Sequence, residues 1–81
     1  MNGEEIFKKI YDSQFDKAKR LLSVPPKSYP LKKWKFIVSG SFNDVMHGVG
    51  VCLVEQKMLT QRECDVLFFN VYKAEMSLLT M

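Results

Sequence analysis

An 81-residue chain has room for one domain around one hydrophobic core, so we expect residues 1–81 to form a single domain. Hydrophobic residues make up 47% of the chain and charged residues 26%, which is typical of a globular protein and argues against a disordered one. The formal net charge is only +3, so the overall charge does not indicate a nucleic-acid-binding protein.

The opening of the chain, Met1-Asn2-Gly3-Glu4-Glu5, is acidic where a secretion signal is basic and apolar. The charge-free runs are far shorter than the ~20 residues that a transmembrane helix needs, so we expect no membrane partner. Two cysteines without a secretion signal are typical of free thiols in a reducing compartment. These features predict a cytoplasmic protein.

Residues Gly3–Leu22 are expected to form the first helix. Apolar side chains recur there at three- and four-residue steps, at Phe7, Ile10, Tyr11, Ala18, Leu21 and Leu22. Asn2 is placed as an N-cap with Glu5 three residues later, and acidic residues suit the positive end of a helix dipole.

A proline pair, Pro25-Pro26, ends this pattern, since neither residue can continue a helix. We therefore expect a short connector over Ser23–Tyr29. Pro30 is suited to the first turn of a second, shorter helix, because its missing N–H is not needed there. The predicted buried side of that helix is Leu31, Trp34, Ile37 and Val38.

A third helix is expected over Asn43–Lys57, capped by Asn43 or Ser41. Its inward residues would be Val45, Val49, Cys52 and Leu53. Gly48 and Gly50 count against this helix, since each costs ~1 kcal/mol relative to alanine. The alternative for residues 34–55 is a β-hairpin with strands near Trp34–Val38 and Gly48–Val54, which would give an α-β-β-α order. We favour the helix, with Gly48 and Cys52 as a small-residue face against a neighbouring helix.

The last helix is expected over Gln61–Leu79. Thr60 and Glu63 match a capping box, and Leu59 and Cys64 stand where a hydrophobic staple would place them. With the preceding helix it would form a helical hairpin. The sequence thus predicts an all-α bundle of three to four helices that ends in this hairpin. The expected core stripe of the last helix is Cys64, Leu67, Phe68, Val71 and Leu78.

No residue pattern predicts catalysis, a metal or a cofactor. A structural zinc site needs four ligands, and the chain offers only Cys52, Cys64 and His47 as Cys or His ligands. His47 lies near Asp44 and Ser41 in the sequence, but a helical chain of this size offers little means of holding such a triad in a dry pocket. We therefore predict that the protein is not an enzyme.

Positive charge is concentrated in one window of the sequence. Seven basic residues and no acidic one lie between Lys17 and Lys35, which gives this window a charge of +7 and leaves the rest of the chain at −4. Such sorting indicates an acidic partner. The expected partner-binding residues are Lys17, Lys19, Arg20, Lys27, Tyr29, Lys32, Lys33, Trp34 and Lys35.

Two partners fit this window. The first is an acidic protein, with Trp34 as an anchor, which would make the chain a regulator, adaptor or inhibitor of the kind that phages often encode. The second is nucleic acid, with lysines on phosphates and Tyr29 or Trp34 stacked on bases. Arginine is scarce here, so readout of base sequence is not expected. We favour the protein partner.

The last helix carries more apolar side chains than one buried stripe accounts for. Val66, Phe69, Tyr72 and Met76 lie beside or opposite the expected core stripe. They would be covered either by a central position of this helix in the bundle or by a second copy of the chain. We expect these four residues to form a homodimer interface.

Overall fold

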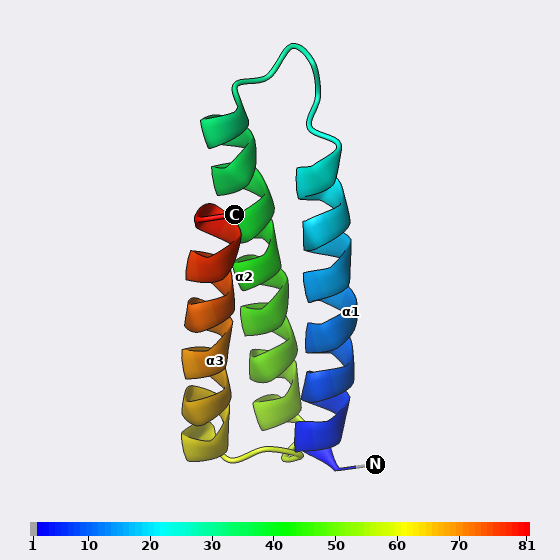
Figure 1. The fold of residues 1–81 in the computed structure, drawn as a ribbon. Helices are drawn as coiled ribbons and strands as arrows, with labels where there is room; N and C mark the ends of the chain where they lie inside the picture. The colour runs from blue at the N-terminus through cyan, green and yellow to red at the C-terminus, as the bar shows by residue number, and fades with distance from the viewer. Residues whose placement is uncertain (1) are drawn as a thin grey trace.

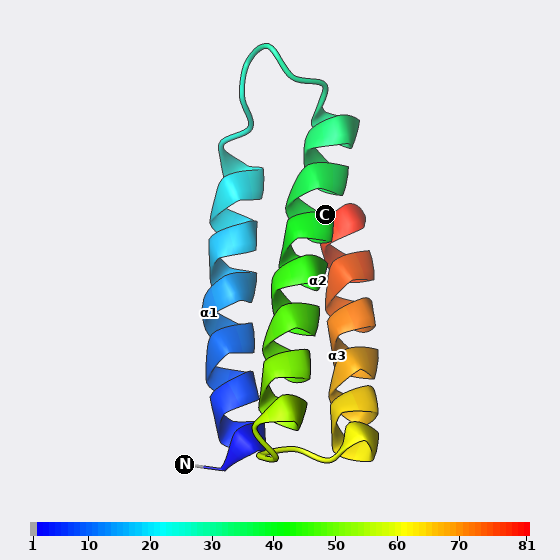
Figure 2. The same cartoon turned by 180° about the vertical axis from the view of Figure 1, so that it is seen from behind.

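The computed structural model describes residues 2–81, which form three helices and no strand: α1 (Gly3–Ser23), α2 (Leu31–Glu55) and α3 (Gln61–Leu79). The helices run up, down and up, with α2 between the other two (Figure 1; Figure 2 shows the opposite side). The bundle is elongated, 43 × 19 × 17 Å. The predicted all-α class and the closing helical hairpin are confirmed.

The predicted second and third helices are one continuous 25-residue helix, α2, and the β-hairpin alternative is wrong. Ser41 and Asn43, expected as caps, lie in the middle of this helix, where the Asn43 amide donates to Glu75 of α3 over 3.3 Å. No proline follows Pro30 in this segment, so nothing interrupts the backbone hydrogen bonds. Packing against two neighbouring helices offsets the low helix propensity of the glycines.

The N-caps predicted at Asn2 and Thr60 are confirmed. The Asn2 side-chain oxygen accepts from the Glu5 backbone N–H at 2.9 Å. At the start of α3, the Thr60 hydroxyl accepts from the Glu63 N–H at 3.1 Å, and the Glu63 carboxylate accepts from the Thr60 N–H at 2.9 Å. These hydrogen bonds hold the pKa of Glu63 below its ordinary value, chiefly through the Thr60 backbone N–H.

The core runs along the inner side of α2, where Phe42 and Met46 are buried, although the sequence pattern pointed to neither. Four residues of α2 that were expected to face inward are exposed instead: Leu31, Ile37, Val45 and Cys52. The error has one cause. In a continuous helix, the residues that face the core are fixed by one 3.6-residue period from residue 31 to 55. Two separate helices could each be rotated independently to bury a different set of residues.

Two glycines permit close contacts between elements. A Cβ on Gly50 would lie 2.6 Å from the Phe68 ring and 2.8 Å from Cys64 Sγ, so α3 packs directly on the α2 backbone there. A Cβ on Gly3 would meet the carbonyl oxygen of Met58, in the turn before α3. The expected contact at Gly48 is wrong: the space beside it is open.

By length and composition, α2 is also apolar enough to cross a membrane, the one such helix among the described residues. One third of its most apolar stretch is buried inside the bundle. A central helix that packs against two neighbours needs the same composition, so apolarity alone does not assign α2 to a membrane.

Candidate functional site

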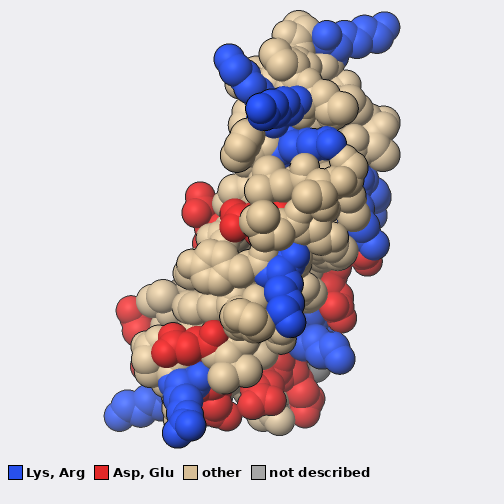
Figure 3. All heavy atoms as spheres, turned by 60° about the vertical axis from the view of Figure 1, so that its left-hand side comes forward, with Lys and Arg blue, Asp and Glu red and all other residues tan. Residues whose placement is uncertain are grey.

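The basic residues of the window 17–35 meet at one end of the bundle, which we call the basic tip. It consists of the last two turns of α1, the connector 24–30 and the first turns of α2. Helix α3 ends short of this level, so the tip projects beyond it (Figure 1). In Figure 3, Lys and Arg side chains project from this end among uncharged atoms, and acidic atoms appear only lower down.

Most of these cations have no partner within the described chain. Lys19 lies 3.4 Å from Asp16 on the exposed side of α1 and 5.1 Å from the Phe15 ring centroid. Lys35 donates to the main-chain carbonyl of Met81. The remaining five form no ion pair within residues 2–81: Lys17, Arg20, Lys27, Lys32 and Lys33. Their charges are therefore free to meet an external anion.

The two aromatic residues of the window are brought together, but they differ in role. Trp34 is half-buried, and its indole N–H donates to the carbonyl of Leu21 over 2.8 Å, which ties the start of α2 to the end of α1. Tyr29 packs edge-on against the indole with ring centroids 6.3 Å apart and stays exposed. Trp34 therefore has a structural role in the tip, and Tyr29 is the more accessible ring.

Apolar side chains are exposed among the tip cations, a feature that the sequence pattern did not reveal. Val24 in the connector is 73% exposed, and Leu31, Phe36 and Ile37 on the first two turns of α2 are also exposed. Leu31 and Ile37 had been expected in the core. The tip therefore offers alternating charged and apolar groups rather than charge alone.

The N-terminus of α2 adds to the positive potential of the tip. Its N-cap is Pro30, which has no capping side chain, and its first turn contains no acidic residue. The first backbone N–H groups of the helix are therefore left to solvent, at the positive end of the helix dipole.

Three other side chains were weighed for chemistry: His47, Cys52 and Cys64. No group of three His, Cys, Asp or Glu that could hold a metal ion occurs within residues 2–81. His47 lies in mid-helix with its ring stacked on Phe68 at 4.1 Å, and its Nε2 has no hydrogen-bond partner. Cys64 is buried, and burial raises the pKa of its thiol, whereas Cys52, expected to be buried as well, is exposed.

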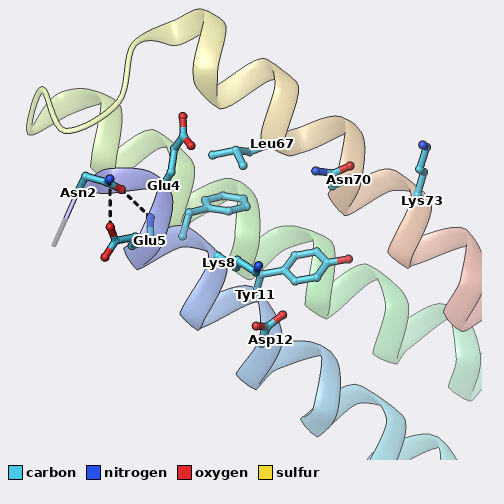
Figure 4. Close-up of a pocket in the computed structure, with 10 residues that line it drawn as sticks. Asn2, Glu4, Glu5, Lys8, Tyr11, Asp12, Leu67, Asn70 and Lys73 are labelled. Atoms are coloured by element: carbon cyan, nitrogen blue, oxygen red, sulfur yellow. Dashed lines mark hydrogen bonds between the residues drawn. The ribbon is translucent and has the colours of Figure 1, made fainter.

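A groove of about 530 Å³ lies between α1 and α3, where these two helices pack on α2 more than on each other. Phe7, Tyr11 and Leu67 provide its apolar surface (Figure 4). Its charged lining has both signs: Lys8, Lys73, Glu4, Glu5 and Asp12. Burial raises the pKa of Tyr11, with a smaller contribution from the neighbouring carboxylate of Asp12. The lining contains no histidine, cysteine or serine.

The four residues expected at a dimer interface lie together on the outer face of α3. Val66, Phe69, Tyr72 and Met76 are all more than half exposed, since α3 flanks the bundle instead of occupying its centre. Lys73 lies over the Phe69 ring, with 4.8 Å from its Nζ to the ring centroid.

Comparison of the chain with known protein families, curated proteins and solved structures gives no match.

Proposed function

We propose that the protein is a non-enzymatic interaction module that docks its basic tip on an acidic surface of another protein. One observation carries this proposal: seven cations and no acidic residue between positions 17 and 35 occupy one end of a narrow bundle. A potential of one sign over a compact surface steers and orients an oppositely charged partner.

Exposed apolar side chains favour protein over nucleic acid. Val24, Leu31 and Phe36 stand among the lysines and would stay in water if the tip met phosphates alone. An acidic protein surface that also carries apolar groups would cover them and pair with the cations. Interfaces typically combine such an apolar centre with a charged rim.

The remainder of the chain supports an oriented approach. Outside residues 17–35 the chain has five basic and nine acidic residues, a net charge of −4, so a surplus of positive charge is found only at the tip. An acidic partner is therefore attracted to the tip more than to the rest of the molecule. The uncapped start of α2 adds backbone N–H donors at the centre of the attractive end.

The test compares two variants with the same change in charge. The tip variant carries Lys27→Glu, Lys32→Glu and Lys33→Glu, and the base variant carries Lys8→Glu, Lys9→Glu and Arg62→Glu. Glutamates in the first turn of α2 suit the helix dipole, so the tip variant is expected to fold. The probe is a designed acidic amphipathic helical peptide, and binding is followed by the fluorescence of Trp34, the only tryptophan.

We expect the tip variant to bind this peptide at least about tenfold more weakly than the wild type, a loss of ~1.4 kcal/mol. The base variant should bind unchanged. A scrambled peptide of the same composition should bind more weakly, since its apolar groups no longer share a face. Equal loss in both variants would contradict the proposal.

Nucleic acid is the second candidate, favoured by the surplus of lysines and by the exposed ring of Tyr29. Random duplex DNA and single-stranded RNA are titrated in parallel at physiological salt. Tighter binding to either of them than to the acidic peptide, lost in the tip variant, would replace the protein partner with this alternative. Such binding would be independent of base sequence, because Arg20 is the only arginine of the tip.

A further inference from the structure

The outer face of α3 carries an apolar stripe that stays more than half exposed, although the Tyr72 ring also contacts His47 of α2 edge-on, with ring centroids 5.8 Å apart. Val66, Phe69, Tyr72 and Met76 are spaced by three or four residues and point away from the buried stripe of Cys64, Val71 and Leu78. In the view that brings this side forward, uncharged atoms make up most of the middle of the visible face, with a few charged side chains among them (Figure 3). We propose that this stripe pairs with the same stripe of a second copy, with the two α3 helices antiparallel.

The area of the stripe is sufficient for a dimer. The four side chains are 52–64% exposed, which amounts to roughly 450 Å² per protomer for side chains of about 150–250 Å². Two copies would bury roughly 900 Å² from these residues alone. With the stems of the flanking Arg62 and Lys73, the total reaches the ~1,000 Å² that marks specific interfaces.

The sorted charge selects the antiparallel arrangement. Parallel helices would place the two basic tips, each with a window charge of +7, side by side. Antiparallel helices send the tips to opposite ends and align the helix dipoles favourably. The antiparallel arrangement also places opposite charges side by side. Asp65 lies four residues before Phe69 and Lys73 four residues after it. A two-fold axis that passes through Phe69 therefore places Asp65 of one copy next to Lys73 of the other.

This inference does not rest on the docking role of the tip, since it concerns a different face. If both hold, the dimer presents two tips that point in opposite directions. It would then bridge two acidic partners, and linked binding of this kind raises apparent affinity without new contacts.

The mass of the full chain is measured by sedimentation velocity at high micromolar concentration with a reductant present, since Cys52 is exposed. We expect a dimer for the wild type and a monomer for the variant with Phe69→Ser and Met76→Ser. The matched control carries Val24→Ser and Val51→Ser, two exposed apolar residues on other faces, and should remain a dimer. Circular dichroism verifies that each variant folds.

Orientation is tested by spin labels at Lys27→Cys in a Cys52→Ser background. Antiparallel pairing predicts a label-to-label distance greater than the 43 Å length of one protomer. A charge exchange gives a second test: Asp65→Lys and Lys73→Asp should each weaken the dimer, and the double variant should restore it.

A monomeric wild type would overturn the proposal, as would a dimer that survives loss of Phe69 and Met76 in a folded chain. A label distance well under 43 Å, or a charge exchange that fails to rescue the dimer, would overturn the antiparallel arrangement.

Discussion

Two glycines of α2, only two positions apart, lie in opposite surroundings. Gly50 faces α3, where a Cβ would come within 2.8 Å of both the Phe68 ring and Cys64 Sγ, whereas nothing lies within 4 Å of a Cβ at Gly48. In a closely packed core, an added methyl group forces neighbouring side chains from their rotamers at a cost of about 1–3 kcal/mol. The gain in helix propensity from glycine to alanine is only ~1 kcal/mol.

These surroundings predict opposite effects of one substitution. Gly50→Ala should lower the free energy of unfolding by about 1 kcal/mol, because overpacking exceeds the propensity gain. Gly48→Ala should raise it by about 0.5–1 kcal/mol, because only the propensity gain applies. Urea denaturation followed by Trp34 fluorescence measures both. Stabilisation by Gly50→Ala would contradict the packing of α3 on α2 described here.

The two cysteines should differ sharply in reactivity. Cys52 is exposed on the outer side of α2, whereas Cys64 is 1% exposed and burial raises the pKa of its thiol, which lowers its thiolate fraction at neutral pH. In native protein a thiol reagent should therefore modify one cysteine rapidly, and the second only after denaturant is added. Peptide mass spectrometry identifies each modified residue, and rapid modification of Cys64 would show that α3 is not docked as described.

At the scale of elements, the continuity of α2 through residues 39–43 is the main departure from the sequence prediction. The chain there reads Ser39-Gly40-Ser41-Phe42-Asn43, which contains small and polar residues typical of helix ends. Burial of Phe42 and the contact of Asn43 with Glu75 favour the unbroken helix. Propensity is a weak guide where tertiary packing decides, and those contacts lie 32 or so residues apart in the sequence.

Proline substitution distinguishes one continuous helix from two helices with a break near residues 39–43. Ser41→Pro should lower the free energy of unfolding by ~3 kcal/mol, since position 41 lies inside a continuous helix and its N–H is hydrogen-bonded. Lys32→Pro, in the first turn of α2, should have little effect. Thermal unfolding followed by circular dichroism provides the comparison. Equal tolerance of both prolines would indicate a helix that starts near Asn43 after all.

The starts of α1 and α3 were more predictable than the buried face of α2. Asn2 with Glu5 and Thr60 with Glu63 are local signals within four residues, and both form the expected hydrogen bonds. The phase of α2 was mistaken, because it depends on the whole helix being one unit. Leu31 and Ile37 are exposed because of the way the whole helix is rotated about its axis. A pattern of neighbouring residues could not predict this exposure.

At the scale of the whole molecule, the position of the cations could be predicted from the sequence because they are close in the chain. A connector with two prolines turns the chain back on itself, so residues on both sides of it share one end of the bundle. The apolar groups among them could not be predicted in the same way. Their exposure depends on α3 ending short of the tip, which leaves the first turns of α2 uncovered on that side.

The surplus of apolar residues on α3 was also visible in the sequence. The sequence alone did not decide between a central position of this helix in the bundle and a second copy that covers its outer face. The helix lies at the flank of the bundle, so its outer stripe remains exposed in one copy. The tip and this stripe share no residue, so the two proposed interactions can be tested independently.

The most direct test of the central claim is a quantitative pull-down from the native host with three baits: the wild type, the tip variant and the base variant defined above. The account predicts acidic proteins that are retained by the wild type and the base variant and lost at least about tenfold with the tip variant. Retention of every captured protein by a folded tip variant would contradict it, since the cations at that end would then contribute nothing to recognition.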